Sequence, residues 1–166
     1  MAVKADQLET RLDTIFEKNA PKLPVHVRKT IAEWAPWIAL LAGVLSLLSA
    51  YWLYQAANAV SAYIDLANQL SAAYGGTVMT SNMTFWVWLG LAFLVVEGLL
   101  YVLAFPGLKA RKKAGWNYLY WGVLVNVAYA VISLFTIDGF TGFVGSLIVA
   151  AIGLWLLFQV RSQYKA

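Results

Sequence analysis

The chain has 166 residues, of which 61% are hydrophobic and 12% are charged. A soluble domain carries about 25% charged residues, so this composition excludes an ordinary globular protein that faces water on every side. The absence of cysteine excludes disulfide exchange, thiolate catalysis and cysteine-ligated metal sites. The formal net charge of +4 is explained better by membrane topology than by nucleic-acid binding, because of where the positive charges lie.

We interpret residues 1–33 as a cytoplasmic N-terminal segment. It carries charges of both signs and has no early apolar core, which is untypical of a cleavable signal peptide. An amphipathic helix is predicted over residues 5–19, because apolar side chains recur there at helical spacing. These side chains are Leu8, Leu12, Ile15 and Phe16. Pro21 and Pro24 are expected to interrupt the helix before the first membrane span.

Four apolar stretches predict a membrane domain over residues 34–160. A bilayer core about 30 Å thick requires about 20 apolar residues in helical conformation. The predicted spans are 36–57, 85–105, 116–137 and 140–160, joined by an outer segment 58–84, an inner loop 106–115 and a tight outer hairpin, and followed by a tail at 161–166. The expected fold is an all-α integral membrane protein, a four-helix transmembrane bundle with an amphipathic N-terminal helix and a short outer amphipathic helix.

The short outer helix is predicted over residues 60–74. One face of this segment is mainly apolar and the Gly75-Gly76 pair is expected to end it. The face comprises Val60, Ile64, Ala67, Leu70 or Ser71, and Tyr74. We expect the segment to lie on the membrane surface or to cap the bundle, and the sequence leaves both placements open.

The 12 basic residues all lie on one side of the predicted spans. They precede the first span, occupy residues 109–113 or follow the fourth span, whereas the other side carries only Asp65 and Asp138. Cytoplasmic segments are enriched in lysine and arginine, so both termini are expected in the cytoplasm. The predicted location is the cell membrane, which is the inner membrane if the source is bacterial.

Glu97 is the only acidic or basic residue within the four predicted spans. A charge near the bilayer centre costs about 2.5 kcal/mol or more, so we expect a neutral carboxyl that faces the bundle interior. Counting 1.5 Å per residue places Glu97 at a depth similar to that of Asn126 and Ser46, so a shared polar layer is expected, with Tyr129 beside it. Two interpretations stay open: a hydrogen bond that joins helices, or a proton or cation site.

Stripes of small residues predict close helix packing. In the third span Gly122, Asn126 and Ala130 are spaced by four, as are Gly142, Ser146 and Ala150 in the fourth, and Gly43 lies on a similar face of the first. Such stripes let helix backbones approach each other closely. They serve packing within the chain, or one of them, on the fourth span, forms a homo-oligomer interface.

Four basic residues gather in the predicted inner loop: Lys109, Arg111, Lys112 and Lys113. They define the topology, and beside a membrane they also attract anionic lipid headgroups. A contact with the acidic residues of the N-terminal segment is a further possibility.

No catalytic motif is recognisable, and we predict neither a metal nor a cofactor nor nucleic-acid binding. The predicted function is therefore non-catalytic: a scaffold, accessory or assembly role through helix packing, with a second copy or another membrane protein as partner. The alternative is a small oligomeric proton-linked transporter or channel that uses Glu97.

Overall fold

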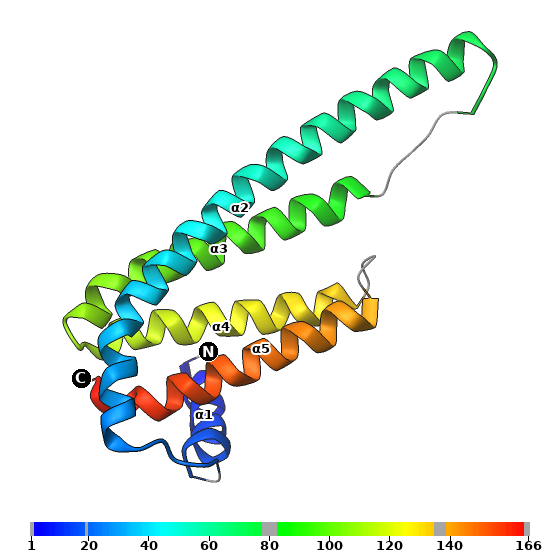
Figure 1. Ribbon diagram of the computed structural model, residues 1–166. Coiled ribbons are helices and arrows are strands. Elements are labelled where there is room, and N and C mark those ends of the chain that lie inside the picture. Colours follow the sequence, from blue (N-terminus) through cyan, green and yellow to red (C-terminus); the bar gives the residue numbers. More distant parts are fainter. Residues whose placement is uncertain (1, 19, 78–82, 135–138, 165–166) are drawn as a thin grey trace.

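The computed structural model describes residues 2–18, 20–77, 83–134 and 139–164, and these residues are predominantly helical. Five α-helices follow one another along the chain, and the described part contains no β-strand element (Figure 1). Three of the helices are long and apolar enough to cross a membrane. This agrees with the expected all-α class and suggests membrane association.

The longest element is α2, a single helix over Val25–Ala73. Its 49 residues correspond to a length of about 70 Å. Residues 60–73 are helical, but they continue α2 directly, so the prediction of a separate outer helix over 60–74 is wrong. The reason lies in composition: no glycine or proline occurs between Gly43 and Gly75, so nothing interrupts the helix.

The helix α3 spans Met83–Lys109 and α4 spans Lys113–Ser133. The expected inner loop 106–115 is therefore too long, because α3 continues through Pro106 and only residues 110–112 connect the two helices. The missing N–H of Pro106 costs one hydrogen bond, yet its carbonyl still accepts one from the Ala110 N–H at 3.0 Å. Arg111, with φ of 56°, adopts the left-handed conformation that turns the chain.

Two glycines allow α3 and α4 to cross closely at this turn. A Cβ built on Gly107 would lie 2.6 Å from the Cα of Gly115, and a Cβ built on Gly115 would lie 2.2 Å from the Leu108 nitrogen. No side chain fits at such distances. The tight inner hairpin therefore depends on glycine at both positions.

The helix α5 spans Gly139–Val160, and a short 3₁₀ turn over Arg161–Gln163 follows it. Asp138, one of the two acids expected in outer loops, lies outside the described residues. The helix α4 is not among the three that qualify as candidate spans. It carries Asn117 and Asn126 and corresponds to the predicted span 116–137. That third span of the expected bundle therefore stays a prediction.

The helices pack in chain order, with α2 against α3, α3 against α4 and α4 against α5. The helices α2 and α5 contact each other only sparsely. In Figure 1, α2 and α3 diverge from α4 and α5 with increasing distance from the inner hairpin. The fully buried core lies near the turn between α3 and α4 and contains Trp116, Phe158 and Leu108.

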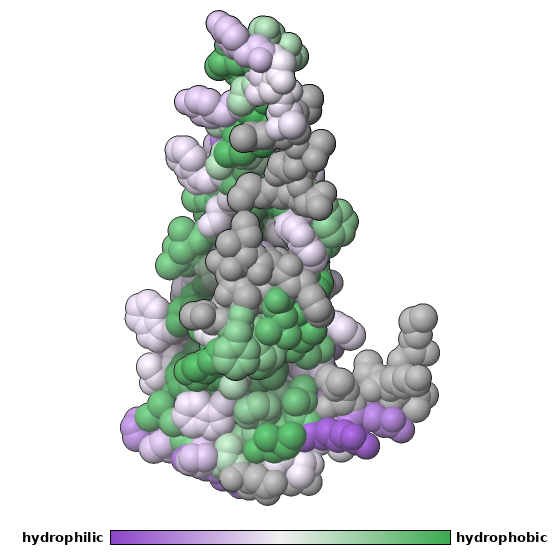
Figure 2. Space-filling view, turned by 90° about the vertical axis from the view of Figure 1, so that its right-hand side faces the viewer, coloured by the Kyte–Doolittle hydropathy of each residue, from purple (hydrophilic) through white to green (hydrophobic). Residues whose placement is uncertain are grey.

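The N-terminal helix α1 spans Ala2–Asp13 and continues into a π-helical turn over Thr14–Lys18, which packs against α5. A helix at the predicted position is thus present. Elsewhere the surface is strongly apolar, and Figure 2 shows hydrophobic residues over much of one face with hydrophilic residues near one end. Exposed examples are Leu41, Trp52, Val149 and Ile152.

We expect Gly115→Ala to destabilise the protein by about 1–3 kcal/mol, the usual cost of overpacking, because the new methyl group would clash with the backbone of α3. Thermal unfolding in mild detergent, followed by circular dichroism, measures this. Gly145→Ala in α5 is the matched control, since a Cβ there meets nothing within 4 Å. Equal melting temperatures for the two variants would refute the role of the glycine crossing.

Candidate functional site

Glu97 lies on α3 and lines a cavity of about 220 Å³ between the diverging helices. All four long helices contribute to the wall. The lining residues are Leu53, Gly90, Phe93, Leu94, Glu97, Val125, Asn126, Tyr129 and Ser146. The cavity thus combines an apolar wall with one carboxyl, one amide and two hydroxyl groups.

The Glu97 carboxyl is hydrogen-bonded to the side chains of Tyr101 and Asn126. Tyr101 follows Glu97 by one helical turn on α3, and Asn126 reaches it from α4. The contact therefore fixes the rotation of these two helices relative to each other. No basic residue lines the cavity, and the neutral state expected of the carboxyl stays a prediction.

The structure brings together three of the four residues predicted for the polar layer. Glu97, Asn126 and Tyr129 line the same cavity. Ser46 does not line it and is half-buried on α2, whereas Ser146 of α5 supplies a hydroxyl group instead. Leu53 lines the cavity from α2, and Ser46 lies seven residues earlier on nearly the same face of that helix. Ser46 is therefore about 10 Å away along the helix axis, so position along α2 keeps it out of the cavity.

Tyr101 was not predicted as part of the site. The signal in the sequence was its spacing of four from Glu97, which places both side chains on one face of a helix. Its ring also packs tightly on α4, because a Cβ built on Gly122 would lie 2.4 Å from the ring. Gly122 therefore makes room for the residue that holds the carboxyl.

The predicted packing residues occupy distinct contacts. Gly43 touches α3, since a Cβ there would lie 2.9 Å from the Gly98 carbonyl oxygen. Ala130 and Ala150 are buried within the chain, and Ser146 faces the cavity. The contacts of Gly142 are not among those that the structure describes. The parts of the stripes that are described therefore pack inside the molecule.

A second polar cluster surrounds Arg161, at the end of the molecule that contains the turn between α3 and α4. Its guanidinium forms ion pairs with Glu9 and Asp13 of α1, the latter at 2.6 Å. The same group lies over the rings of Trp116 and Phe158, at 5.3 and 5.9 Å from their centroids. Arg161 was predicted only to mark topology, because sequence spacing does not reveal a contact with residues about 150 positions away.

Gln159 links the N-terminal segment to α5 through hydrogen bonds. Its side chain is buried, accepts a hydrogen bond from the Leu23 N–H at 3.2 Å and donates one to the Phe16 carbonyl at 3.1 Å. The N-terminal segment is therefore packed against the inner end of the helices. Buried amides with both ends satisfied stabilise such a contact.

The basic residues of the inner connection face different surroundings. Lys109 lies 5.7 Å from the ring centroid of Trp37, and Arg111 lies 5.9 Å from that of Tyr164. Lys112 and Lys113 are exposed. Burial raises the pKa of the Tyr164 phenol, and the nearby Arg111 charge opposes this rise.

The acidic residues Glu9 and Asp13 pair with Arg161 rather than with the cluster at 109–113. These two carboxylates therefore do not form the ionic contact that was considered between the basic cluster and the N-terminal segment. Among the other acids of that segment, Glu33 is exposed, and the side chains of Asp6 and Glu17 lie outside the described part.

Comparisons of the chain with protein-family models, curated proteins and solved structures gave no match.

We expect Glu97→Leu to lower the free energy of unfolding by about 1–3 kcal/mol, because it leaves the buried polar groups of Asn126 and Tyr101 without their partner. Glu97→Gln keeps the shape and the hydrogen-bonding capacity of a neutral carboxyl, so a smaller loss is expected. Chemical or thermal unfolding in detergent compares the two variants. A greater loss for Gln than for Leu would contradict a neutral carboxyl that joins the helices.

Proposed function

We propose that the protein is a small multi-pass membrane protein with a non-catalytic scaffold or assembly role, and that it associates with a second copy of itself through α2. The observation that carries the proposal is a helix face at the outer end of α2. We call this face the outer stripe, and it consists of Val60, Tyr63, Ala67, Leu70 and Tyr74.

The proposed topology has four spans with both termini in the cytoplasm. It is supported by the charge distribution, since all 12 basic residues flank the same ends of the spans. Aromatic residues such as Trp37 and Trp116 near one end and Trp52 and Trp88 near the other fit the two headgroup regions. In this topology the outer end of α2 leaves the bilayer on the non-cytoplasmic side.

The outer end of α2 extends beyond its partner helix. Tyr54 packs on Trp88, with ring centroids 6.0 Å apart, and α3 begins five residues before Trp88. Residue 59 of α2 is therefore about level with the start of α3, and the remaining helix projects by about 20 Å. Figure 1 shows this projection beyond the start of α3.

The outer stripe has the spacing of a helix that pairs with another helix. Its members alternate by three and four residues, which is the a and d pattern of a coiled coil. Tyr63 is 74% exposed, Leu70 is 54% exposed and Tyr74 is 88% exposed. Apolar side chains so exposed in water favour burial against a partner, at about 25 cal/mol for each Å² of apolar surface.

A second copy is the partner that we propose for this stripe, because two copies with the same orientation in one membrane would present identical outer stripes to each other. In such a parallel pair each apolar side chain would meet its counterpart at the same height.

Transport is the second candidate function, and the cavity of about 220 Å³ at Glu97 favours it. An acidic residue in a membrane span beside two hydroxyl groups and an amide is suited to holding a proton or a small cation. Against it stands the contact of Glu97 with Asn126 and Tyr101, which already uses the carboxyl for structure.

The absence of cysteine from the chain makes a direct test of association simple. We expect Leu70→Cys to form disulfide-linked dimers on mild oxidation in membranes, because this position belongs to the outer stripe. Ala72→Cys is the matched control, since it lies about 200° around the helix on the opposite face. Comparable dimer yields for both variants, or none for either, would overturn pairing through the outer stripe.

Proton flux separates the two candidate functions. We expect liposomes containing the wild type or Glu97→Gln to show the same low proton permeability, measured with an entrapped pH-sensitive dye. A flux in the wild type that the Gln variant abolishes would instead establish Glu97 as a transport residue.

A further inference from the structure

Two cavities at the inner end of the molecule share one lining residue, Tyr164. One is apolar and has a volume of about 250 Å³, and the other is polar and has a volume of about 330 Å³. Tyr164 is itself buried and lies just after the 3₁₀ turn that follows α5. An apolar space on one side of Tyr164 and a polar space on the other suit an amphipathic ligand.

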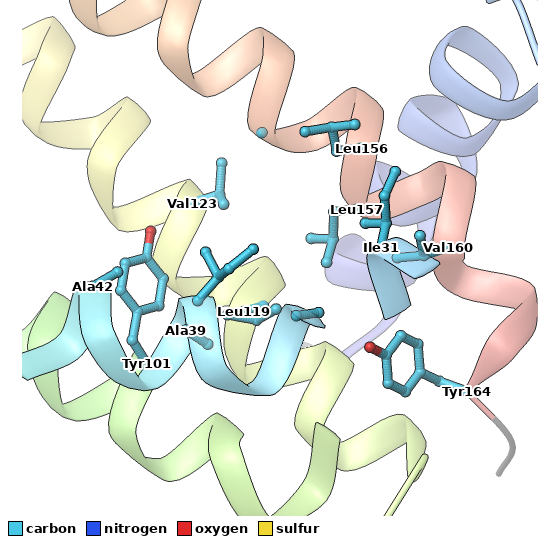
Figure 3. A pocket seen from close by; sticks show the side chains of 13 residues that line it. Ile31, Ala39, Ala42, Tyr101, Leu119, Val123, Leu156, Leu157, Val160 and Tyr164 are labelled. Atoms are coloured by element: carbon cyan, nitrogen blue, oxygen red, sulfur yellow. The ribbon is translucent and has the colours of Figure 1, made fainter. Parts of the chain in front are cut away.

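The apolar cavity lies between α2 and α5, where these helices begin to diverge. Ala39 and Ile31 line it from α2, Val123 from α4, and Gly153 and Leu157 from α5. Figure 3 shows the side chains of α2, α4 and α5 around this space, with Tyr164 at one end. Because the lining is almost entirely hydrocarbon, the cavity suits an acyl chain.

The polar cavity is lined by Lys113, Arg161, Ser162, Trp116, Asp13 and Tyr164. Arg161 pairs with two carboxylates, Glu9 and Asp13, so this group of three carries a net negative charge. Lys113 has no carboxylate partner among the described side chains, and the same holds for Arg111 beside Tyr164. Three basic and two acidic side chains thus leave a net positive charge of one at the cavity and its edge.

We propose that these two cavities form one site for an anionic phospholipid of the inner leaflet. One acyl chain fills the apolar cavity between α2 and α5, and the headgroup phosphate binds Lys113, with Arg111 nearby. The site depends on the membrane topology proposed above but not on self-association or on Glu97.

The charge of the site selects the headgroup class. A basic residue at a membrane surface contributes attraction for anionic lipid that a zwitterionic lipid, with its own ammonium group, does not receive to the same extent. Arg161 does not add to this selection, because the charges of its two acidic partners exceed its own. Lys113 is therefore the main determinant for the phosphate in this site.

Native mass spectrometry of the full chain tests the proposal. The protein is purified in detergent with equimolar phosphatidylglycerol and phosphatidylcholine, and retained lipid is counted. We expect one tightly held phosphatidylglycerol. Lys113→Gln is expected to weaken this binding about five-fold, the effect of losing one basic contact, whereas Lys112→Gln, which alters a neighbouring exposed lysine outside the cavity, leaves it unchanged.

The acyl arm of the site has its own pair of variants. Gly153→Leu places a side chain into the apolar cavity, and a Cβ at this position meets only Val123, at 3.9 Å, so the helix tolerates it. We expect this variant to lose the retained lipid, whereas the control Gly145→Leu, on an open part of α5, keeps it.

Three outcomes would overturn the lipid site. Equal retention of phosphatidylglycerol and phosphatidylcholine would show that charge does not select the lipid. Lipid retention that Gly153→Leu leaves unchanged would show that the apolar cavity does not hold an acyl chain. Displacement of the lipid signal by millimolar inorganic phosphate alone would show an anion site without an acyl component. Disulfide-linked dimers of the Leu70→Cys variant report on self-association independently of all three.

Discussion

The close crossing of α3 and α4 at Gly107 and Gly115 is the constraint on which the rest of the structure depends. Two backbones that touch at one end of a hairpin leave the other end free to diverge. The core of Trp116, Phe158 and Leu108 packs beside this crossing, and α1 is held against it by Arg161 and Gln159. One end of the molecule is therefore tightly packed, and the helices separate from there.

Two of the three cavities described above lie between the diverging helices. The apolar cavity lies between α2 and α5 near the packed end, and the Glu97 cavity lies farther from that end. Tyr101 lies between them, because it lines the apolar cavity and bonds the Glu97 carboxyl. The hydrogen bond between Glu97 and Asn126 joins α3 to α4 away from the Gly107–Gly115 crossing, which limits the separation of the two helix pairs.

The polar groups at Glu97 and Arg161 are engaged in contacts within the chain. The carboxyl of Glu97 is engaged by two neighbours, and the ion pairs of the described part join α1 to the end of α5. The least satisfied features are the exposed outer stripe of α2 and the uncompensated Lys113 beside an apolar space. A second helix would cover the first and a lipid would cover the second, so both proposals concern contacts that a membrane environment supplies.

The sequence by itself determined the helical class and the approximate position of each apolar helix, because these depend on local composition and length. It also identified Glu97, Asn126 and Tyr129, because a polar residue in an apolar helix stands out. Only the tertiary structure decided that α2 continues to Ala73, that α3 passes through Pro106, and that Ser146 rather than Ser46 faces the cavity. Helix rotation and long-range contacts such as Arg161 with Glu9 depend on how the helices pack, and residue spacing along one helix does not contain that information.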